Sequence, residues 1–243
     1  MRILLALAWL LLAVPPALAQ ATDSLAAQVR ARAYAQLERA GVEIARESLH
    51  DRCLADDSLS VRSLVTVGLP IDLVRTEATP LQAAAAMGAV RCATSLLNLG
   101  AQVDFDPASV GSPLALASGR GHVEIVRLLL TRGASLDFSK TLLVSEPMTR
   151  AAGRGHLDVM RLLFEAGATT VFGLNAAVSA DQRAAAQWLV QRMLARDMEM
   201  AYWTACTHAQ PRTAYRRMME RAGFTKTCDQ LRAEDREAAG NRP

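Results

Sequence analysis

Residues 112–134 read SPLALASGRGHVEIVRLLLTRGA, and residues 146–168 read EPMTRAAGRGHLDVMRLLFEAGA, so the two stretches align without a gap. A third copy precedes them, because Pro80, Pro113 and Pro147 are 33 and 34 residues apart. In each copy a Gly-Ala pair follows twenty residues after the proline. A period of this length is typical of repeat proteins, in which short structural units stack side by side.

Each copy predicts two short helices. Thr79-Pro80 and Ser112-Pro113 place a hydroxyl cap before a proline, which suits the first turn of a helix. Gly121 and Gly133 predict where the first and the second helix end, because glycine adopts positive φ without strain. The second helix carries apolar residues at helical spacing, and one unit cannot cover that face alone. With only 5% aromatic residues in the chain, the pattern predicts an all-α solenoid of stacked helix-turn-helix units.

These residues resemble the ankyrin repeat, with its T-P-L-H-x-A opening, its G-H-x-E middle and its L-L-x-x-G-A close. The resemblance extends from Thr79 to Ala168 and implies a stack that binds other proteins. Where the family usually has histidine after Pro-Leu, this chain has Gln82, Ala115 and Thr149. We therefore expect the hydrogen bonds that this histidine would make between repeats to be replaced or absent.

The repeats are expected to fill residues 47–226, about six in all when degenerate copies are included. An amphipathic helix over 23–40, with Leu25, Val29, Ala33 and Leu37 on one face, is suited to cover the N-terminal end of the stack. Residues 20–46 are thus predicted to be a capping helix with its connection, and 227–243 a tail. The clear repeats are 79–106, 112–139 and 146–172, and the degenerate ones are 47–74, 173–198 and 199–226.

Residues 1–19 have the features of a secretory signal peptide. Arg2 supplies a positive charge, Ile3–Val14 is an apolar run of twelve residues, and Ala17-Leu18-Ala19 has the form of a signal-peptidase site. Twelve helical residues span about 18 Å, less than a hydrocarbon core of about 30 Å. The alternative, a buried N-terminal helix, leaves Pro15-Pro16 and the small-residue site unexplained. We predict cleavage near Ala19-Gln20, no membrane anchor and a periplasmic location.

Four apolar side chains recur at one repeat position. Leu73, Phe105, Phe138 and Phe172 each follow a closing glycine by five residues, and three of the five phenylalanines of the chain are among them. Stacking would place the four in a row. The row is either an exposed strip that binds a partner or a set of side chains that pack under their own connections.

Three arginines also recur in the repeats. Arg120 and Arg154 directly precede the glycine that ends the first helix, and Arg150 lies one turn before Arg154. The resemblance implies that such residues face the concave surface, where they would meet an acidic patch on a partner. Solvated surface arginines are the alternative. A net charge of +3 over 243 residues does not favour binding of nucleic acid.

The four cysteines, Cys53, Cys92, Cys206 and Cys228, would enter an oxidising compartment behind a signal peptide. Three pairings are possible. We favour Cys206 with Cys228 and Cys53 with Cys92, since each pair then stays at one end of the stack. Cys92 also stands where other repeats have buried Ile125 and Val159, so a small core residue is the alternative.

The histidines do not predict catalysis. His122 and His156 belong to the Gly-His step before the second helix, and His50 fits the histidine position of the repeat itself, whereas His208 stands alone. No nucleophile and base, phosphate-binding loop or metal-ligand spacing recurs near them. We predict no catalytic residue, no cofactor and no metal site.

The divergent region from Leu174 to Pro243 holds one grouping that could suggest chemistry. Its members also fit bulky packing in a terminal cap. They are Trp188, Tyr202, Trp203, Cys206 and His208.

The predicted function is a non-enzymatic periplasmic module, monomeric on its own, that binds another protein. Related exported ankyrin proteins suggest two jobs: neutralising a delivered toxin as an immunity protein, or assisting and protecting a periplasmic enzyme such as a redox or peroxide-defence enzyme. An enzyme that uses the divergent C-terminal region is a third alternative.

Overall fold

The structure is a computed structural model that describes residues 16–45, 48–75, 77–136 and 146–192, together with 217–218, 220–222 and 230. For residues 16–23 and 171 it describes the backbone alone. Within these ranges the backbone is helical apart from turns, connections and an isolated antiparallel bridge between Arg75 and Ala78.

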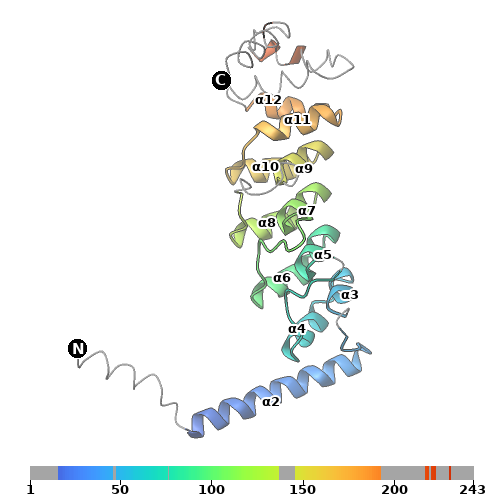
Figure 1. The fold of residues 1–243 in the computed structure, drawn as a ribbon, viewed down its shortest axis with the longest axis vertical. Helices are drawn as coiled ribbons and strands as arrows, with labels where there is room; N and C mark the ends of the chain where they lie inside the picture. The colour runs from blue at the N-terminus through green and yellow to red at the C-terminus, as the bar shows by residue number, and fades with distance from the viewer. Residues whose placement is uncertain are drawn as a thin grey trace, which may run out of the picture.

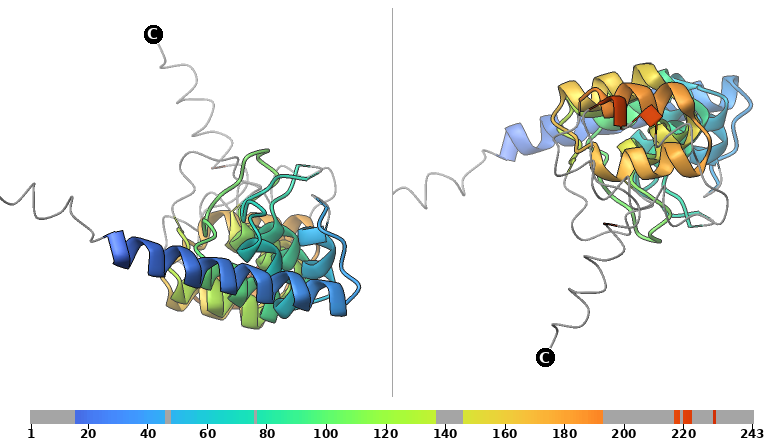
Figure 2. Two further views of the ribbon diagram at one scale, coloured as in Figure 1. Left: turned by 90° about the horizontal axis from the view of Figure 1, so that it is seen from below. Right: turned by 90° about the horizontal axis from the view of Figure 1, so that it is seen from above.

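Helix pairs stack into a column, with the first helix of each pair along one side and the second along the other (Figure 1). The all-α solenoid expected from the repeat pattern is thereby confirmed. The connection after the first helix pair and the connection after the second pair project on the same side of the column (Figure 2). The pairs are α3 (Ser48–Leu54) with α4 (Ser58–Thr66), α5 (Pro80–Met87) with α6 (Val90–Asn98), α7 (Pro113–Arg120) with α8 (Val123–Thr131), α9 (Pro147–Arg154) with α10 (Leu157–Glu165), and α11 (Val171–Ser179) with α12 (Arg183–Val190).

Side-chain caps set where the first helices begin. The hydroxyl of Thr79 accepts from the backbone N–H of Gln82 at 3.1 Å, and the Gln82 side chain accepts from the backbone N–H of Thr79 at 2.8 Å. This reciprocal capping box satisfies two N–H groups that the helix itself leaves unpaired. Ser112 caps α7 in a simpler way, accepting from the N–H of Ala115 at 3.2 Å.

A residue with positive φ ends each first helix. Gly88, Gly121 and Gly155 hold φ of 78°, 79° and 75° after α5, α7 and α9. In the outer pairs an aspartate takes this place, with φ of 50° at Asp56 and 57° at Asp181. Aspartate enters the left-handed region more readily than most residues, which explains how the degenerate repeats keep the turn.

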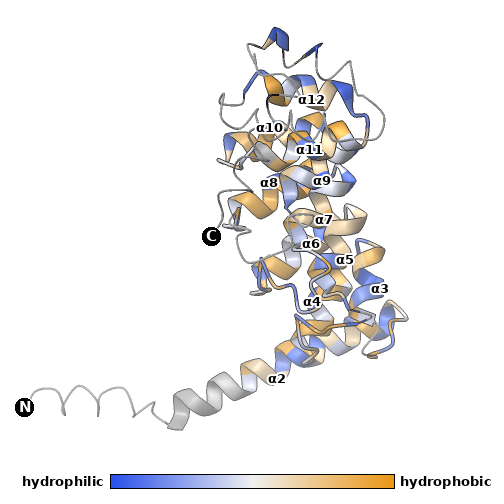
Figure 3. Ribbon diagram, turned by 45° about the horizontal axis from the view of Figure 1, so that its top comes forward, coloured by the Kyte–Doolittle hydropathy of each residue, from blue (hydrophilic) through white to orange (hydrophobic). Residues whose placement is uncertain are grey.

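The core runs continuously through the column. Leu81, Leu114, Met148 and Leu174 occupy one position in successive first helices, and none is more than 1% exposed. Hydrophobic residues recur along the column from α4 to α12 (Figure 3). Because each pair buries its apolar faces only against its neighbours, the stability of one repeat depends on the next.

Helix α2 (Pro16–Arg39) crosses the N-terminal end of the stack and packs on α4 (Figure 1). Ala33 and Leu37 are buried there, but Leu25 and Val29 are 61% and 45% exposed. The prediction that all four cover the stack is therefore wrong for Leu25 and Val29. With 24 residues, α2 is about 36 Å long, whereas two helices side by side are about 20 Å wide, so its N-terminal half extends past the column.

The sixth predicted repeat, 199–226, and the tail 227–243 lie outside the described residues, except for 217–218, 220–222 and 230. None of the helices in the described ranges combines the length and the hydrophobicity that crossing a membrane requires.

Candidate partner-binding surface

The first helices form one side of the column, and a shallow hollow of about 410 Å³ lies on it between α7, α9 and α11. The three arginines singled out in the sequence therefore meet at one place. Partner binding by them stays a prediction. The lining residues are Leu116, Gly119, Arg120, Thr149, Arg150, Gly153, Arg154 and Ala176.

Arg120 and Arg154 are the exposed members of this set. They are the last residues of α7 and α9, so they occupy the same position in successive repeats. Within the described ranges, neither guanidinium takes part in an ion pair. Both are therefore placed to meet an anionic group on another molecule.

Arg150 has a structural task. It is half-buried, and its Nη2 donates to the carbonyl oxygen of Val110 at 3.0 Å, which ties α9 to the connection before α7. Burial lowers the pKa of the Arg150 guanidinium, the Asp106 carboxylate opposes this, and the charge of Arg154 adds to it. The guanidinium stays protonated at neutral pH because the ordinary pKa of arginine lies far above neutrality. Arg150 thus adds positive charge to the hollow and also binds the connection that precedes α7.

Gln82 replaces the histidine that the repeat usually has. Its Nε2 donates to the carbonyl oxygen of Gly111 at 2.9 Å and to Asp106 Oδ1 at 3.1 Å, both in the next repeat. In the first pair His50 Nε2 donates to the carbonyl oxygen of Ala78 at 2.9 Å. Ala78 and Gly111 each directly precede the cap of the next first helix. At Gln82 an amide thus replaces the bond between repeats, as one of the two expected outcomes, and at His50 the histidine itself forms this bond.

A different link serves the repeat that has Thr149 at this position. Buried Glu146 accepts from the hydroxyl of Thr149 at 2.7 Å and from that of Thr169, near the start of the next repeat, at 2.8 Å. The carboxylate thus bridges two repeats in place of the histidine. Ala115, which has no polar side chain, cannot form such a link.

His122 links its repeat to the preceding one. Its Nε2 donates to the carbonyl oxygen of Ala86 at 3.2 Å, in the preceding repeat. The same ring packs against Gly88, where a Cβ would lie 2.9 Å from Nδ1. Among the residues that the structure describes, no group of histidine, cysteine, aspartate and glutamate side chains could hold a metal ion. His208 lies outside the described residues.

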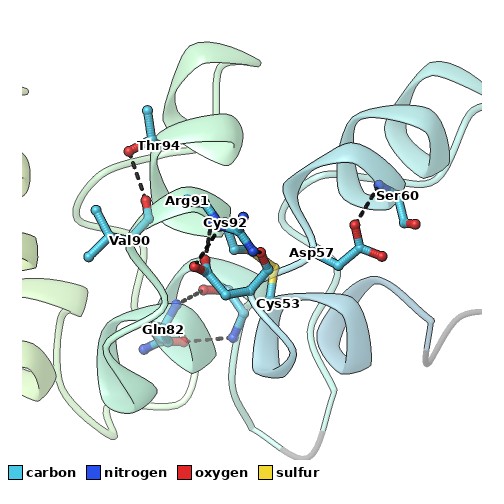
Figure 4. The surroundings of a disulfide bond; sticks show 10 residues. Cys53, Asp57, Ser60, Gln82, Val90, Arg91, Cys92 and Thr94 are labelled. Atoms are coloured by element: carbon cyan, nitrogen blue, oxygen red, sulfur yellow. Dashed lines mark hydrogen bonds and ion pairs between the residues drawn. A yellow bond between two sulfur atoms is a disulfide. The ribbon is translucent and has the colours of Figure 1, made fainter.

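A disulfide joins Cys53 of α3 to Cys92 of α6, so it links the first two repeats (Figure 4). Both sulfur-bearing residues are fully buried. Asp56 supports the junction, since it accepts from the backbone N–H of Cys92 at 2.8 Å and from Arg91 Nε at 3.1 Å. The pairing favoured for these two cysteines is the one that the structure contains. Cys206 and Cys228 lie outside the described residues.

The apolar row is interrupted. Leu73 and Phe105 lie in the connections after α4 and α6, and both are half-buried. Phe172 does not share their position, because it lies in the first turn of α11, where the preceding connection is shorter. Phe138 lies outside the described residues. The row predicted from spacing therefore does not extend to Phe172, and partner binding by Leu73 and Phe105 stays a prediction.

Trp188 serves packing at the C-terminal end. It is 8% exposed, its ring and that of Phe164 pack edge to face with centroids 5.6 Å apart, and the Arg192 guanidinium lies 4.2 Å from its centroid. Such aromatic and cation–π contacts stabilise an outer repeat. Tyr202, Trp203 and His208, which were grouped with Trp188, lie outside the described residues.

Sequence reasoning missed two features of this surface. Met87 precedes Gly88 just as Arg120 precedes Gly121, so an apolar side chain that is 58% exposed occupies the arginine position one repeat earlier. Gly119 and Gly153 open the hollow. Their signal was in the sequence, since both are glycines inside a helix at one repeat position.

Helix-turn-helix pairs stacked into a column define the class of helical-repeat proteins, which commonly bind other molecules through an extended surface. The comparisons identify the repeat: residues 49–140 match the family model described as ankyrin repeats, three copies. The crystal structure of the human ASB11 ankyrin repeat domain superposes with a TM-score of 0.60 at 21% identity, covering 73% of this chain and 84% of that one. No curated protein sequence matches the chain significantly. Residues 49–140 thus contain ankyrin repeats, and the described helix pairs have the fold of an ankyrin repeat domain. Ankyrin repeats are protein–protein interaction modules that generally lack enzymatic activity.

Proposed function

We propose that the chain is an exported binding protein that recognises an acidic region of a partner protein through its first helices. The observation that carries the proposal is the alignment of Arg120 and Arg154 beside the hollow, with no anionic partner among the described residues. A rigid column holds these guanidiniums in place before the partner arrives, which lowers the entropic cost of binding.

The buried disulfide between Cys53 and Cys92 supports a compartment outside the reducing cytosol. The signal-peptide pattern at residues 1–19 points the same way. We therefore assign the protein to the periplasm in this proposal.

The test is to purify the tagged chain from the periplasm with its bound protein, and then to titrate the purified partner against charge-reversal variants. Arg120→Glu combined with Arg154→Glu should weaken binding at least about tenfold, with the largest loss at low salt. A matched control reverses Arg127 and Arg132, two exposed arginines associated with the second helix α8. Equal affinity of both double variants and the parent would contradict the proposed face.

Within this role we propose inhibition of a delivered toxin. A basic hollow on a rigid scaffold can cover an acidic functional surface of another protein. If the partner is an enzyme, its activity should fall to background at a stoichiometric amount of this chain. Unchanged or longer-lasting partner activity would instead favour the accessory or protective role for a periplasmic enzyme.

A further inference from the structure

The hollow between α7 and α9 owes its shape to two glycines inside helices. Gly119 and Gly153 each stand one residue before the arginine that ends the helix, and neither has positive φ. Glycine inside a helix is less favourable than alanine, so it needs another reason to be there. The equivalent residues of α5 and α11 are Ala86 and Ser179, so the repeat itself does not require glycine at this position.

The two glycines differ in what a side chain would meet. A Cβ on Gly119 would lie 3.3 Å from the Cβ of Arg150, so this glycine gives room to the arginine stem. A Cβ on Gly153 would lie 3.5 Å from the Cβ of Ala176, which is an ordinary contact. Packing therefore explains Gly119. At Gly153 a methyl group would fit, so packing does not require glycine there, and this glycine lines the hollow.

Positive charge surrounds that space. Exposed Arg120 and Arg154 and half-buried Arg150 all line the hollow. None of the described residues that line the hollow is acidic. Guanidinium groups bind carboxylates by paired hydrogen bonds, so the hollow is complementary to a carboxylate on a side chain.

The neighbouring part of the same surface is apolar. Met87 occupies the position of Arg120 one repeat earlier and is 58% exposed, and Leu54, near the end of α3, is 50% exposed. First helices of adjacent repeats pack about 8–10 Å apart. The surface thus changes from basic to apolar over one to two helix spacings toward the N-terminal end.

We propose that the hollow receives an aspartate or glutamate side chain from an extended segment of the partner protein, while an apolar residue of that segment rests on Met87 and Leu54. This deepens the proposed function and rests on it. One to two helix spacings correspond to about three to six residues of extended chain, at about 3.3 Å per residue. The acidic and the apolar residue should be separated by that number of positions, with the acidic residue toward α9.

The experiment uses a phage-displayed library of random sixteen-residue peptides, selected on the purified full chain. Enriched peptides are synthesised with a fluorophore and titrated by anisotropy. The selected sequences should share an acidic residue three to six positions from a large apolar one. Replacing that acidic residue by its amide, glutamine or asparagine, should weaken binding at least about tenfold.

Gly153→Leu fills the hollow and should weaken the same peptides at least about tenfold. Its matched control is Ala184→Leu, which adds the same bulk to an exposed position of the second helix α12. Thermal melts followed by circular dichroism show whether each variant is folded. The amide peptides test the carboxylate without any change to the protein, so a poorly folded Gly153→Leu does not remove the test.

Three results would overturn the proposal: amide peptides that bind as tightly as acidic ones, undiminished binding to folded Gly153→Leu, or displacement of the peptides by free glutamate at the same concentration as unlabelled peptide. Binding measurements with the purified partner distinguish the proposal about the hollow from the broader proposal about the binding face. A partner that loses affinity for the Arg120→Glu, Arg154→Glu variant but not for Gly153→Leu would refute the hollow alone. A partner unaffected by both would refute the binding face as well.

Discussion

The imidazole of His156 lies against Gly121, with Nδ1 2.7 Å from the point where a Cβ on that glycine would stand. Gly121 also holds φ at 79°. Glycine is required there for two independent reasons, the left-handed backbone and the space for the ring of the next repeat. Contacts of this kind couple adjacent repeats directly.

We expect Gly121→Ala to lower the free energy of unfolding by at least about 1–2 kcal/mol, because alanine is strained at positive φ. Gly153→Ala should raise it by about 0.5–1 kcal/mol, since Gly153 has ordinary helical φ and room for a methyl group. Urea unfolding of the two variants and the parent measures both effects. A loss of stability in Gly153→Ala would show that the fold itself needs that glycine.

Gln82→Ala should destabilise the protein by about 1–3 kcal/mol, because it removes a buried amide that caps α5 and binds Gly111. Gln102→Ala is the control, since Gln102 is exposed, and we expect a change within about 0.5 kcal/mol. Both are measured by urea unfolding under the same conditions. Equal stability of the two variants would contradict the prediction that the Gln82 hydrogen bonds between repeats stabilise the fold.

Stability should fall as the pH drops below about 6.5, in part because of His50. Burial lowers the pKa of His50 below 6.5; its bond to Ala78 and the charge of Asp51 oppose this, while Arg75 adds to the decrease. Nδ1 is buried and has no hydrogen-bond partner among the residues that the structure describes, so a proton there is poorly accommodated. The folded state therefore binds this proton less readily than the unfolded state, and the stabilisation present above pH 6.5 is lost on acidification.

The matched variant is His50→Gln, because glutamine forms the equivalent bond at position 82. Its free energy of unfolding should depend less on pH between 6.5 and the folded-state pKa of His50 than that of the parent. Urea unfolding at several pH values tests this. An unchanged pH dependence in His50→Gln would assign the acid sensitivity to other groups.

The disulfide should contribute up to about 4 kcal/mol to stability, since it closes a loop across a separation of 39 residues. Urea unfolding of the double variant Cys53→Ala, Cys92→Ala beside the parent measures this contribution.

Peptide mapping without reductant should recover a fragment in which Cys53 and Cys92 are linked. The same map tests the predicted pairing of Cys206 with Cys228. Free thiols at Cys53 and Cys92 in the exported protein would contradict the assignment.

The secreted protein should begin near Gln20. Edman sequencing or intact mass of the chain recovered from the periplasmic fraction checks the predicted cleavage after Ala19. A chain that keeps Met1 and fractionates with the cytosol would refute both the signal peptide and the proposed location.

Most of the repeat architecture could be predicted because it is encoded locally. Thr79-Pro80 and Ser112-Pro113 start helices, and Gly88, Gly121 and Gly155 end them, through interactions within a few residues of chain. The surface was predicted less completely. Spacing placed Phe172 in register with Phe105, but a shorter connection puts it in α11, and spacing alone cannot show that a helix begins early.

The amino-acid sequence alone determined the period, the helix pairs and the positions that recur, because caps, prolines, glycines and apolar spacing act over one or two turns. Only the tertiary structure decided which recurring residues remain open to a partner. Arg154 is exposed while Arg150, four residues earlier, is held by Val110 from another repeat, and the first half of α2 extends past the stack. These outcomes depend on what lies opposite each side chain in space, and that is set by packing between segments distant in the chain.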